Sequence, residues 1–159
     1  MQIKTTDLCD ELGDTVQVLA ARFVDLGGKA DFQGQAVTVK CFEDNSRIKE
    51  LSTQPGEGRV LVVDGGGSDR CALFGDHIAE VLLNNGWAGV VVHGYVRDKA
   101  VLRTLPMAIK ALGVTPRKSV KRNEGQRGLA VSFGGVTIAE GAWLYADEDG
   151  VVVLDRPYA

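Results

Sequence analysis

Hydrophobic and polar residues follow one another along the chain in patterns that predict several short helices and strands. Within residues 6–19, apolar side chains recur every three or four positions, at Leu8, Leu12, Val16 and Leu19. This spacing predicts one or two short helices, interrupted near Gly13. Thr6 and Asp7 stand at the start of the segment and are the expected helix caps.

The first strand is expected in residues 34–42. Apolar side chains alternate there with polar ones, at Val37, Val39 and Cys41. This period of two is typical of a half-buried strand. Residues 48–52 favour a short helix, and residues 59–64 form a continuous, mainly β-branched run that predicts a strand buried on both faces.

A second helix and strand follow the glycine run at residues 65–67. Asp76 stands near the start of a helical stretch that ends near residues 84–86, with one apolar face formed by Ile78, Val81 and Leu82. Residues 89–94 repeat the pattern of a short buried strand followed by glycine. Since strands joined through a helix cross over with a right-handed connection, we expect residues 59–64 and 89–94 to belong to one sheet.

The C-terminal third is mostly β. Residues 129–133, 136–138 and 151–154 read as strands, separated by a Gly-Gly turn and by the Asp-Glu-Asp-Gly turn at residues 147–150. Residues 106–112 have a mixed pattern, and the polar run 117–128 is expected to be a surface loop. The whole pattern predicts an α/β fold, a helix-flanked sheet with an added β layer.

Composition limits the class of protein. With 159 residues, 45% apolar and 25% charged, the chain suits one domain over residues 1–159. A net charge of −3, with both signs spread along the sequence, disfavours direct binding to nucleic acid or to anionic membranes. The three cysteines lack CxxC spacing, and no apolar run approaches the roughly 20 residues that span a bilayer. Acidic residues stand where a signal peptide would be hydrophobic, so a cytoplasmic protein is expected.

Two familiar ligand-binding patterns are incomplete. The run Gly65-x-Gly67-x-x-Arg70 has arginine where a dinucleotide-binding fingerprint needs a third glycine, so a tight turn is the favoured interpretation. Asp69 and Arg70 are expected to pair with each other. His77 and His93 are too far apart in sequence for a zinc motif, which disfavours a zinc hydrolase.

Asp76 and the pair Arg97-Asp98 are the strongest candidates for chemistry. Asp76 lies at an expected helix start, where it is either an N-cap or part of a site for a substrate carboxylate or oxyanion. Arg97 can bind a carboxylate in bidentate fashion, and Asp98 offers a hard oxygen ligand to Mg²⁺; alternatively, both cap the end of a strand. Strand–helix–strand connectivity should bring the loop after Asp64 together with these residues in one crevice.

Two further groups favour ordinary structural roles. The basic residues of the polar run lack interleaved aromatic residues and fit a solvated loop better than a site for phosphates or an acidic protein; they are Arg117, Lys118, Lys121, Arg122 and Arg127. The large aromatic residues are expected in the core or at a subunit contact; they are Trp87, Phe133, Trp143 and Tyr145.

Taken together, these motifs identify a family. The chain resembles, over essentially its whole length, the family of the regulator of ribonuclease activity A (RraA), which includes class II 4-hydroxy-4-methyl-2-oxoglutarate aldolases. The matching segments are residues 38–45, 60–67, 75–76, 85–87, 94–98, 133–137 and 145–147. The family signature is an aspartate, twenty intervening residues and then Arg-Asp, which Asp76, Arg97 and Asp98 satisfy without a gap.

The resemblance implies a fold and an activity. The fold would be a three-layer β/β/α sandwich of the RraA-like, swivelling phosphohistidine-domain type, assembled as a homotrimer with sites at the subunit interfaces. The implied activity is a lyase reaction, metal-dependent retro-aldol cleavage of 4-hydroxy-4-methyl-2-oxoglutarate to two pyruvate molecules. Oxaloacetate decarboxylation through the same pyruvate enolate would be a second activity.

The resemblance also implies residue roles. In the aldolases, the equivalent of Arg97 binds the pyruvyl carboxylate, that of Asp98 ligates a divalent metal, Mg²⁺ or Mn²⁺, and that of Asp76 acts through metal-bound water. Residues Gly75, Asp76, His77 and Ile78 would line the substrate.

The chain differs from the full aldolases in one respect, and the family also includes a second possible function. The full aldolases add acidic metal-site residues from a neighbouring subunit on a C-terminal extension that this shorter chain is expected to lack. The alternative function is a regulator that binds ribonuclease E and inhibits RNA processing without catalysis.

Overall fold

The computed structural model describes residues 3–20 and 22–158. The chain begins with α1 (Thr5–Leu12), a 3₁₀ turn η1 (Gly13–Thr15) and two short strands, β1 (Gln17–Val18) and β2 (Val24–Asp25). The central elements follow as β3 (Phe32–Lys40), α2 (Ser46–Ser52), β4 (Val60–Asp64), α3 (Asp76–Asn84), β5 (Gly89–Val96), α4 (Lys99–Leu102) and β6 (Ala108–Val114). The last are β7 (Gln126–Arg127), β8 (Val131–Phe133), β9 (Val136–Ile138), β10 (Trp143–Asp147) and β11 (Gly150–Leu154).

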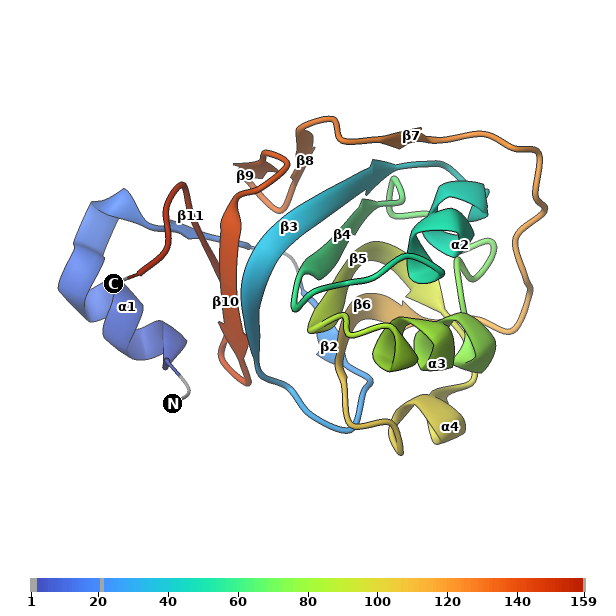
Figure 1. The fold of residues 1–159 in the computed structure, drawn as a ribbon, viewed down its shortest axis with the longest axis horizontal. Helices are drawn as coiled ribbons and strands as arrows, with labels where there is room; N and C mark the ends of the chain where they lie inside the picture. Colours follow the sequence, from blue (N-terminus) through green and yellow to red (C-terminus); the bar gives the residue numbers. More distant parts are fainter. Residues whose placement is uncertain (1–2, 21, 159) are drawn as a thin grey trace.

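Four parallel strands form the centre of the main sheet. The strand order is β1-β11-β10-β3-β4-β5-β6-β2, with β7 paired to β3 off this path. Within it, β3, β4, β5 and β6 run parallel, whereas β10, β11, β1 and β2 are antiparallel to their neighbours. The predicted pairing of residues 59–64 with 89–94 is confirmed, with Val60 opposite Gly89 and Asp64 opposite His93. Figure 1 shows the sheet curling so that β3 lies beside both β4 and β10.

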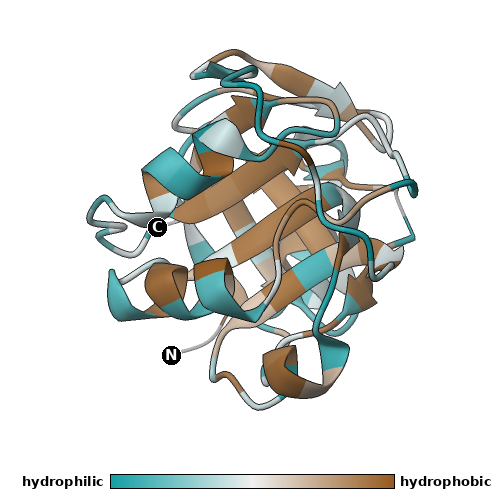
Figure 2. Ribbon diagram, turned by 90° about the vertical axis from the view of Figure 1, so that its right-hand side faces the viewer, coloured by the Kyte–Doolittle hydropathy of each residue, from teal (hydrophilic) through white to brown (hydrophobic). Residues whose placement is uncertain are grey.

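Helices cover one face of the parallel strands. Successive side chains of a strand point to opposite faces, and in β4 Leu61 and Val63 pack toward the helices while Val60 and Val62 pack away from them. The helix side includes Ile48 of α2 and other apolar residues of α2 and α3, all in one cluster. Figure 2 shows these helices in front of a largely apolar sheet. Burial of both faces explains the continuous β-branched run, since each buried Val or Leu side chain contributes about 1.5–3 kcal/mol.

The second β layer lies on the other face of the parallel strands. The hairpin β8–β9 packs with Phe32, Ala36, Val60 and Val62 in a second cluster that also includes inward residues of β10 and β11. This layer changes one expectation: residues 36–39 of β3 are buried on both faces, so the strand is not half-buried there. The three layers agree with the expected β/β/α arrangement. Helix α1 packs on the remaining face of β10 and β11, where Leu8 meets Tyr145 and Val152.

Several element boundaries differ from the sequence prediction. Helix α1 begins at Thr5 after an N-cap at Lys4 that makes no side-chain cap bond, so Thr6 and Asp7 lie inside the helix and are not its caps. The strands at residues 108–114 and 143–147 show no alternation of apolar and polar residues, because most side chains on both faces of each strand are buried.

Among the described residues, no helix has both the length and the apolar character that a membrane crossing needs.

Candidate active site

The carboxyl ends of the parallel strands surround a pocket of about 150 Å³. Such ends are where ligands bind in open α/β sheets. The pocket is formed by the start of α2, the segment before α3, the turn after β5 and the segment after β6; its residues are Asn45, Lys49, Ala72, Phe74, Gly75, Asp76, His77, Ile78, Arg97, Asp98, Lys118, Ser119 and Lys121. All five residues proposed from the sequence to bind substrate, and Asp98, therefore lie together.

The charged residues that line this pocket, and not its volume, distinguish it from another hollow on the molecule. A larger hollow of about 340 Å³ lies between β9 and β11 and contains Glu140 and Asp155, but its lining includes no Lys, Arg or His that would attract an acid.

Asp98 caps helix α3 from a separate part of the chain. Its Oδ2 accepts a hydrogen bond from the backbone N–H of Asp76 at 3.0 Å. The helix begins at Asp76, and its N-cap residue, Gly75, has no side chain to do this. Asp76 is therefore the first helical residue and not the N-cap, and the free N–H groups of the helix start are partly satisfied by the second aspartate of the signature.

Gly75 makes this close approach possible. A Cβ placed on Gly75 would lie 2.1 Å from Asp98 Oδ2 and 3.0 Å from Arg97 Cγ. A side chain at this position would displace the carboxylate. Gly75 is thus required because the turn after β5 passes directly against the helix start.

The backbone of Asp98 has a left-handed conformation, with φ 67° and ψ 41°. Asp and Asn adopt this conformation more readily than other residues with side chains. The Asp98 carbonyl also accepts the N–H groups of Val101 and Leu102, at 3.0 and 2.9 Å, and so starts α4. These constraints fix the direction in which the Asp98 side chain leaves the backbone.

Arg97 is held at the end of β5 by its backbone and its side chain. Its N–H donates to the carbonyl of Phe74 at 3.0 Å, which joins the end of β5 to the segment before α3. Its Nη1 donates to the carbonyl of Pro116 at 3.5 Å, a long bond. The remaining guanidinium donors are suited to a bidentate carboxylate bound in the pocket.

The polar run after β6 is not a loose loop. It crosses the end of β5 and then pairs with Ala72, whose N–H donates to the Arg117 carbonyl at 2.6 Å and whose carbonyl accepts the Ser119 N–H at 3.1 Å. We call residues 115–125 the strap. The expected surface loop is confirmed, because all five basic residues of the run are exposed, while these backbone bonds tie part of the loop to the segment before α3.

Asp44 anchors the far end of the strap. The side chain is 2% exposed, and its Oδ2 accepts the N–H groups of Arg122 and Glu124 at 2.6 and 3.2 Å. Burial opposes the charged form of this carboxyl. Its hydrogen bonds, led by those from Ser46, more than offset this effect and lower the pKa to about 2.

Two buried polar atoms at the pocket have no partner among the described residues. Asn45 donates from Nδ2 to the Leu73 carbonyl at 2.7 Å, but its Oδ1 accepts nothing. The hydroxyl of Ser119 likewise has no partner. The two residues are 6% and 5% exposed. Buried polar atoms are nearly always hydrogen-bonded, so an unpartnered pair beside one pocket indicates a ligand or water there. In the sequence, Asn45 belonged to the matching segment 38–45 without a role, and no motif marked Ser119.

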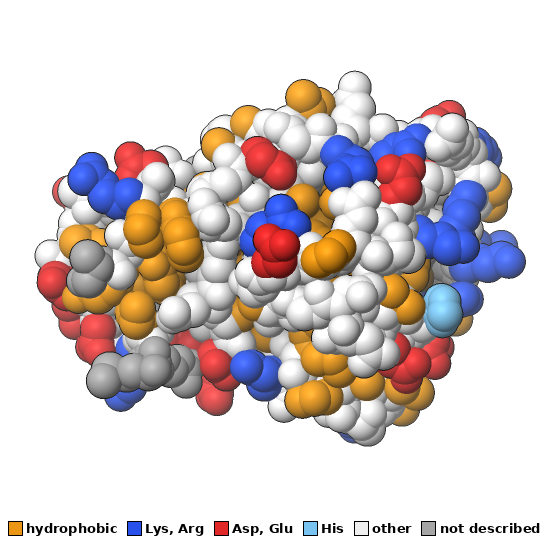
Figure 3. Space-filling model, in the orientation of Figure 1, with side chains coloured by type: hydrophobic (Ala, Val, Ile, Leu, Met, Phe, Trp, Pro, Cys, Tyr) orange, Lys and Arg blue, Asp and Glu red, His pale blue; other side chains and the backbone are white. Residues whose placement is uncertain are grey.

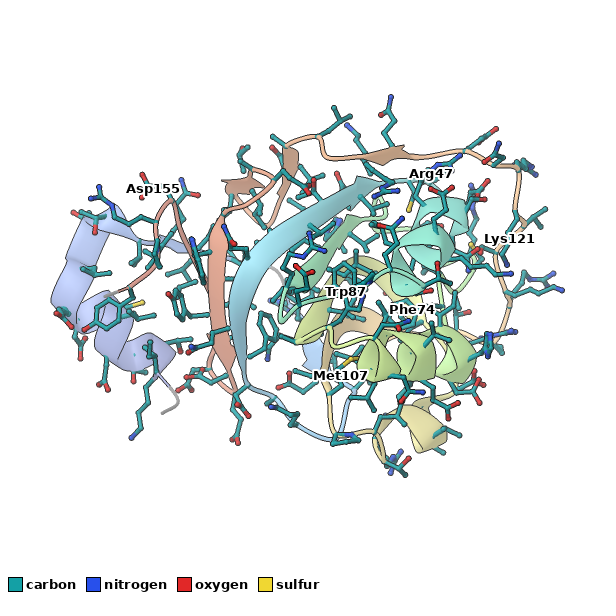
Figure 4. The ribbon with its side chains drawn as sticks, viewed as in Figure 1. Arg47, Phe74, Trp87, Met107, Lys121 and Asp155 are labelled. Atoms are coloured by element: carbon teal, nitrogen blue, oxygen red, sulfur yellow. The ribbon has the colours of Figure 1, made fainter. Side chains whose placement is uncertain are left out.

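Cationic side chains outnumber carboxylates around the pocket. The cations are Lys49, Arg97, Lys118 and Lys121, against Asp76 and Asp98. Figure 3 shows Lys and Arg side chains gathered at this end of the molecule, around a histidine. In Figure 4, Lys121 extends from the strap, and Phe74 lies deeper, near α2 and α3. The pocket is therefore suited to an anionic ligand.

The glycine loop after Asp64 does not line this pocket, which corrects one part of the expected convergence. It is tied instead to β5, since the N–H groups of Gly65 and Gly67 both donate to the His93 carbonyl at 3.1 Å. Arg70 does not pair with its neighbour Asp69: its Nε donates to Glu43 at 2.6 Å. The loop is a tight turn beside the site.

The acidic residues of the pocket fit a divalent cation that shares its coordination shell with other ligands. Across the described residues, no group of three or more His, Cys, Asp or Glu side chains could hold a metal ion by itself. Mg²⁺, however, commonly takes one or two carboxylates and completes its shell with water and substrate oxygens. The second oxygen of Asp98 and the Asp76 carboxylate are donors of this kind. The site is thus suited to Mg²⁺ in the presence of substrate and not to a closed protein cage.

Comparison with known proteins identifies the family. A family model described as RraA-like, Aldolase/RraA, matches residues 5–153. The chain belongs to this RraA-like family. A relative from Alkalilimnicola ehrlichii, 57% identical over 96% of this chain and 95% of its own, is named "Putative 4-hydroxy-4-methyl-2-oxoglutarate aldolase".

Solved structures of RraA-like proteins have the same fold. The RNA-processing inhibitor RraA from Thermus thermophilis is 43% identical and superimposes with a TM-score of 0.96, covering 100% of this chain and 96% of that one. A Geobacillus kaustophilus protein named S-adenosylmethionine: 2-dimethylmenaquinone methyltransferase is 44% identical, with a TM-score of 0.94, covering 98% and 96%. These similarities confirm the expected RraA-like sandwich, whereas the names given to the relatives differ.

Proposed function

We propose that this protein is a divalent-metal-dependent carbon–carbon lyase that cleaves 4-hydroxy-4-methyl-2-oxoglutarate to two pyruvate molecules. The observation that carries the proposal is the meeting of Asp76, Arg97 and Asp98 in one cationic pocket at the strand ends. The name of the Alkalilimnicola relative agrees with this activity.

Arg97 orients the substrate. Its guanidinium binds the carboxylate next to the 2-oxo group through two parallel hydrogen bonds, which fixes the plane of the reacting carbons. Its backbone bond to Phe74 holds it in place before substrate enters. Residues Gly75 to Ile78, at the start of α3, line the substrate on the side of the pocket next to Asp98.

The cleavage moves one proton and one electron pair. The C4 hydroxyl loses its proton as the C3–C4 bond breaks, and C4 becomes the ketone of the first pyruvate. The bonding pair passes to C3 and the 2-oxo group, giving an enolate, and protonation at C3 yields the second pyruvate. Asp76 is the proposed acceptor of the hydroxyl proton, directly or across one water.

Asp98 is the residue that would hold Mg²⁺ or Mn²⁺, with Asp76 beside it acting through water. The cation, when bound, supplies Lewis-acid stabilisation of the negative charge that develops on the 2-oxo oxygen. Oxaloacetate decarboxylation requires the same residues, since loss of CO₂ leaves the same pyruvate enolate. We therefore propose it as a secondary activity.

The size of the pocket favours this assignment over a methyltransferase. A volume of about 150 Å³ suits a small 2-oxo acid. It is well below the roughly 300–1,000 Å³ that larger ligands occupy.

Pyruvate release coupled to lactate dehydrogenase tests the proposal. We expect Mg²⁺-dependent turnover of 4-hydroxy-4-methyl-2-oxoglutarate, abolished by EDTA and restored by added Mg²⁺. Arg97→Lys should lower kcat/KM about 100-fold, because the ammonium cannot form the bidentate contact.

The choice of variant at Asp98 separates catalysis from folding. Asp98→Asn keeps an acceptor for the Asp76 N–H and tolerates the left-handed backbone, but it loses the charge that a metal needs. It should fold normally and lose activity, whereas Asp14→Asn, in the distant η1 turn, should retain full activity. Turnover that survives both EDTA and Asp98→Asn would refute the metal mechanism.

A second function is supported by the Thermus neighbour, which is named an RNA-processing inhibitor. We propose that binding to ribonuclease E is a further or alternative role, carried out by a homotrimer. Binding of purified ribonuclease E, measured by biolayer interferometry, should be unchanged by Asp98→Asn. No binding at micromolar concentration would exclude this role, and light scattering would test the trimer.

A further inference from the structure

The strap contributes polar residues to the pocket beyond its contact with Arg97. Lys118 and Ser119 both line the pocket. Lys118 is exposed, but Ser119 is 5% exposed, and its hydroxyl has no partner among the described residues. The proposed reaction uses neither residue.

Backbone pairing gives the separation between these two residues and the turn that carries Arg97. Ala72 is bridged on one side to Tyr95, near the end of β5, and on the other side to Lys118. The strap therefore lies two strand spacings from β5, about 10 Å between backbones. The Arg97 side chain spans this separation, because its Nη1 lies 3.5 Å from the Pro116 carbonyl of the strap, two residues before Lys118. A short ligand with two carboxylates could therefore contact both Arg97 and the Lys118–Ser119 pair.

The charges around the Lys118–Ser119 pair favour an anion. Lys118 and Lys121 of the strap and Lys49 of α2 line the pocket together with Ser119, and the carboxylates of the pocket, Asp76 and Asp98, come from the start of α3 and the turn after β5. A hydroxyl donor beside ammonium groups suits a carboxylate, whose oxygens accept several hydrogen bonds.

We propose that Ser119 and Lys118 bind the second carboxylate of the substrate, so that the site selects 2-oxo diacids over 2-oxo monoacids. This inference rests on the proposed function, because it assumes that Arg97 holds the carboxylate beside the 2-oxo group. It assigns specificity to two residues of the strap that take no part in bond cleavage.

Binding of two matched ligands tests the assignment without turnover. 2-Oxoglutarate and 2-oxopentanoate have the same carbon chain and differ in the terminal carboxylate, and neither has the 4-hydroxyl group needed for cleavage. Isothermal titration calorimetry with Mg²⁺ present should show 2-oxoglutarate binding about tenfold more tightly to the unmodified protein.

Two strap variants and one control locate the effect. Ser119→Ala should remove most of this preference and leave 2-oxopentanoate affinity unchanged. It should fold, because the hydroxyl makes no hydrogen bond in the described structure. Lys118→Gln should reduce the preference severalfold. Lys29→Gln, a matched change near the opposite end of β6, should have no effect.

The possible outcomes separate this inference from the proposed function. Equal binding of the two ligands to the unmodified protein, or a preference that persists in both strap variants, would overturn the subsite. If no pyruvate is released from any substrate but the preference exists and depends on Ser119, the lyase assignment fails while the diacid subsite stands.

Discussion

Replacement of Gly75 by alanine tests whether the contact between Gly75 and Asp98 organises the site. The added Cβ would lie 2.1 Å from Asp98 Oδ2. Real Cβ contacts are not shorter than 3.0 Å, so the carboxylate must move by about 1 Å or more. That movement breaks the 3.0 Å bond from the Asp76 N–H and shifts the proposed metal ligand.

The cost can be estimated from these contacts. Loss of the cap costs about 1 kcal/mol, and forcing a methyl group into a filled space costs about 1–3 kcal/mol. Alanine restricts the unfolded chain more than glycine does, which returns about 0.4–1 kcal/mol. We expect Gly75→Ala to lower the free energy of unfolding by about 1–3 kcal/mol and kcat/KM about 100-fold, since a shift of about 1 Å is large for a catalytic group.

A double-mutant cycle isolates the clash from other effects. Asp98→Gly removes the carboxylate and is compatible with the left-handed backbone at that position. In that background Gly75→Ala should cost at least about 1 kcal/mol less, measured by urea denaturation of the four proteins. An identical cost in both backgrounds would refute the argument that the contact with Asp98 is what requires glycine.

Two further predictions concern stability away from the reacting groups. Because the folded-state pKa of Asp44 is about 2 and the ordinary value is 3.8, its stabilising effect is present above pH 4 and is lost as the pH falls toward 2. Asp44→Asn should therefore cost about 1–2 kcal/mol at pH 7 and flatten the pH dependence of unfolding between pH 5 and 2; an unchanged slope would contradict the lowered pKa. Thr5 donates to Asp147 from both its N–H and its hydroxyl, at 2.8 and 2.7 Å. Thr5→Val removes the hydroxyl bond and should lower the free energy of unfolding by roughly 1 kcal/mol, measured as a lower melting temperature. Thr6→Val, on the exposed side of α1, should leave the melting temperature nearly unchanged.

The local pattern of residues was sufficient for the central elements of the fold. Uninterrupted apolar, mainly β-branched residues at 60–63 indicated a strand buried on both faces, and Asp76 followed by regularly spaced apolar residues indicated the start of α3. Such signals depend on residues a few positions apart, and the sequence contains them directly. Strands 108–114 and 143–147 lacked a clear period because neighbours on both faces bury most of their side chains.

The sequence by itself also determined the family and the Asp76, Arg97 and Asp98 signature, since spacing along a strand–helix–strand unit brings those positions to one edge of the sheet. Only the tertiary structure decided that Asp98, and not Asp76, caps α3, and that Gly75 is needed for their contact. It also decided that the strap places Lys118 and Ser119 beside them. These relations join segments more than twenty residues apart in the chain, and they depend on how separate elements pack, which no local period records.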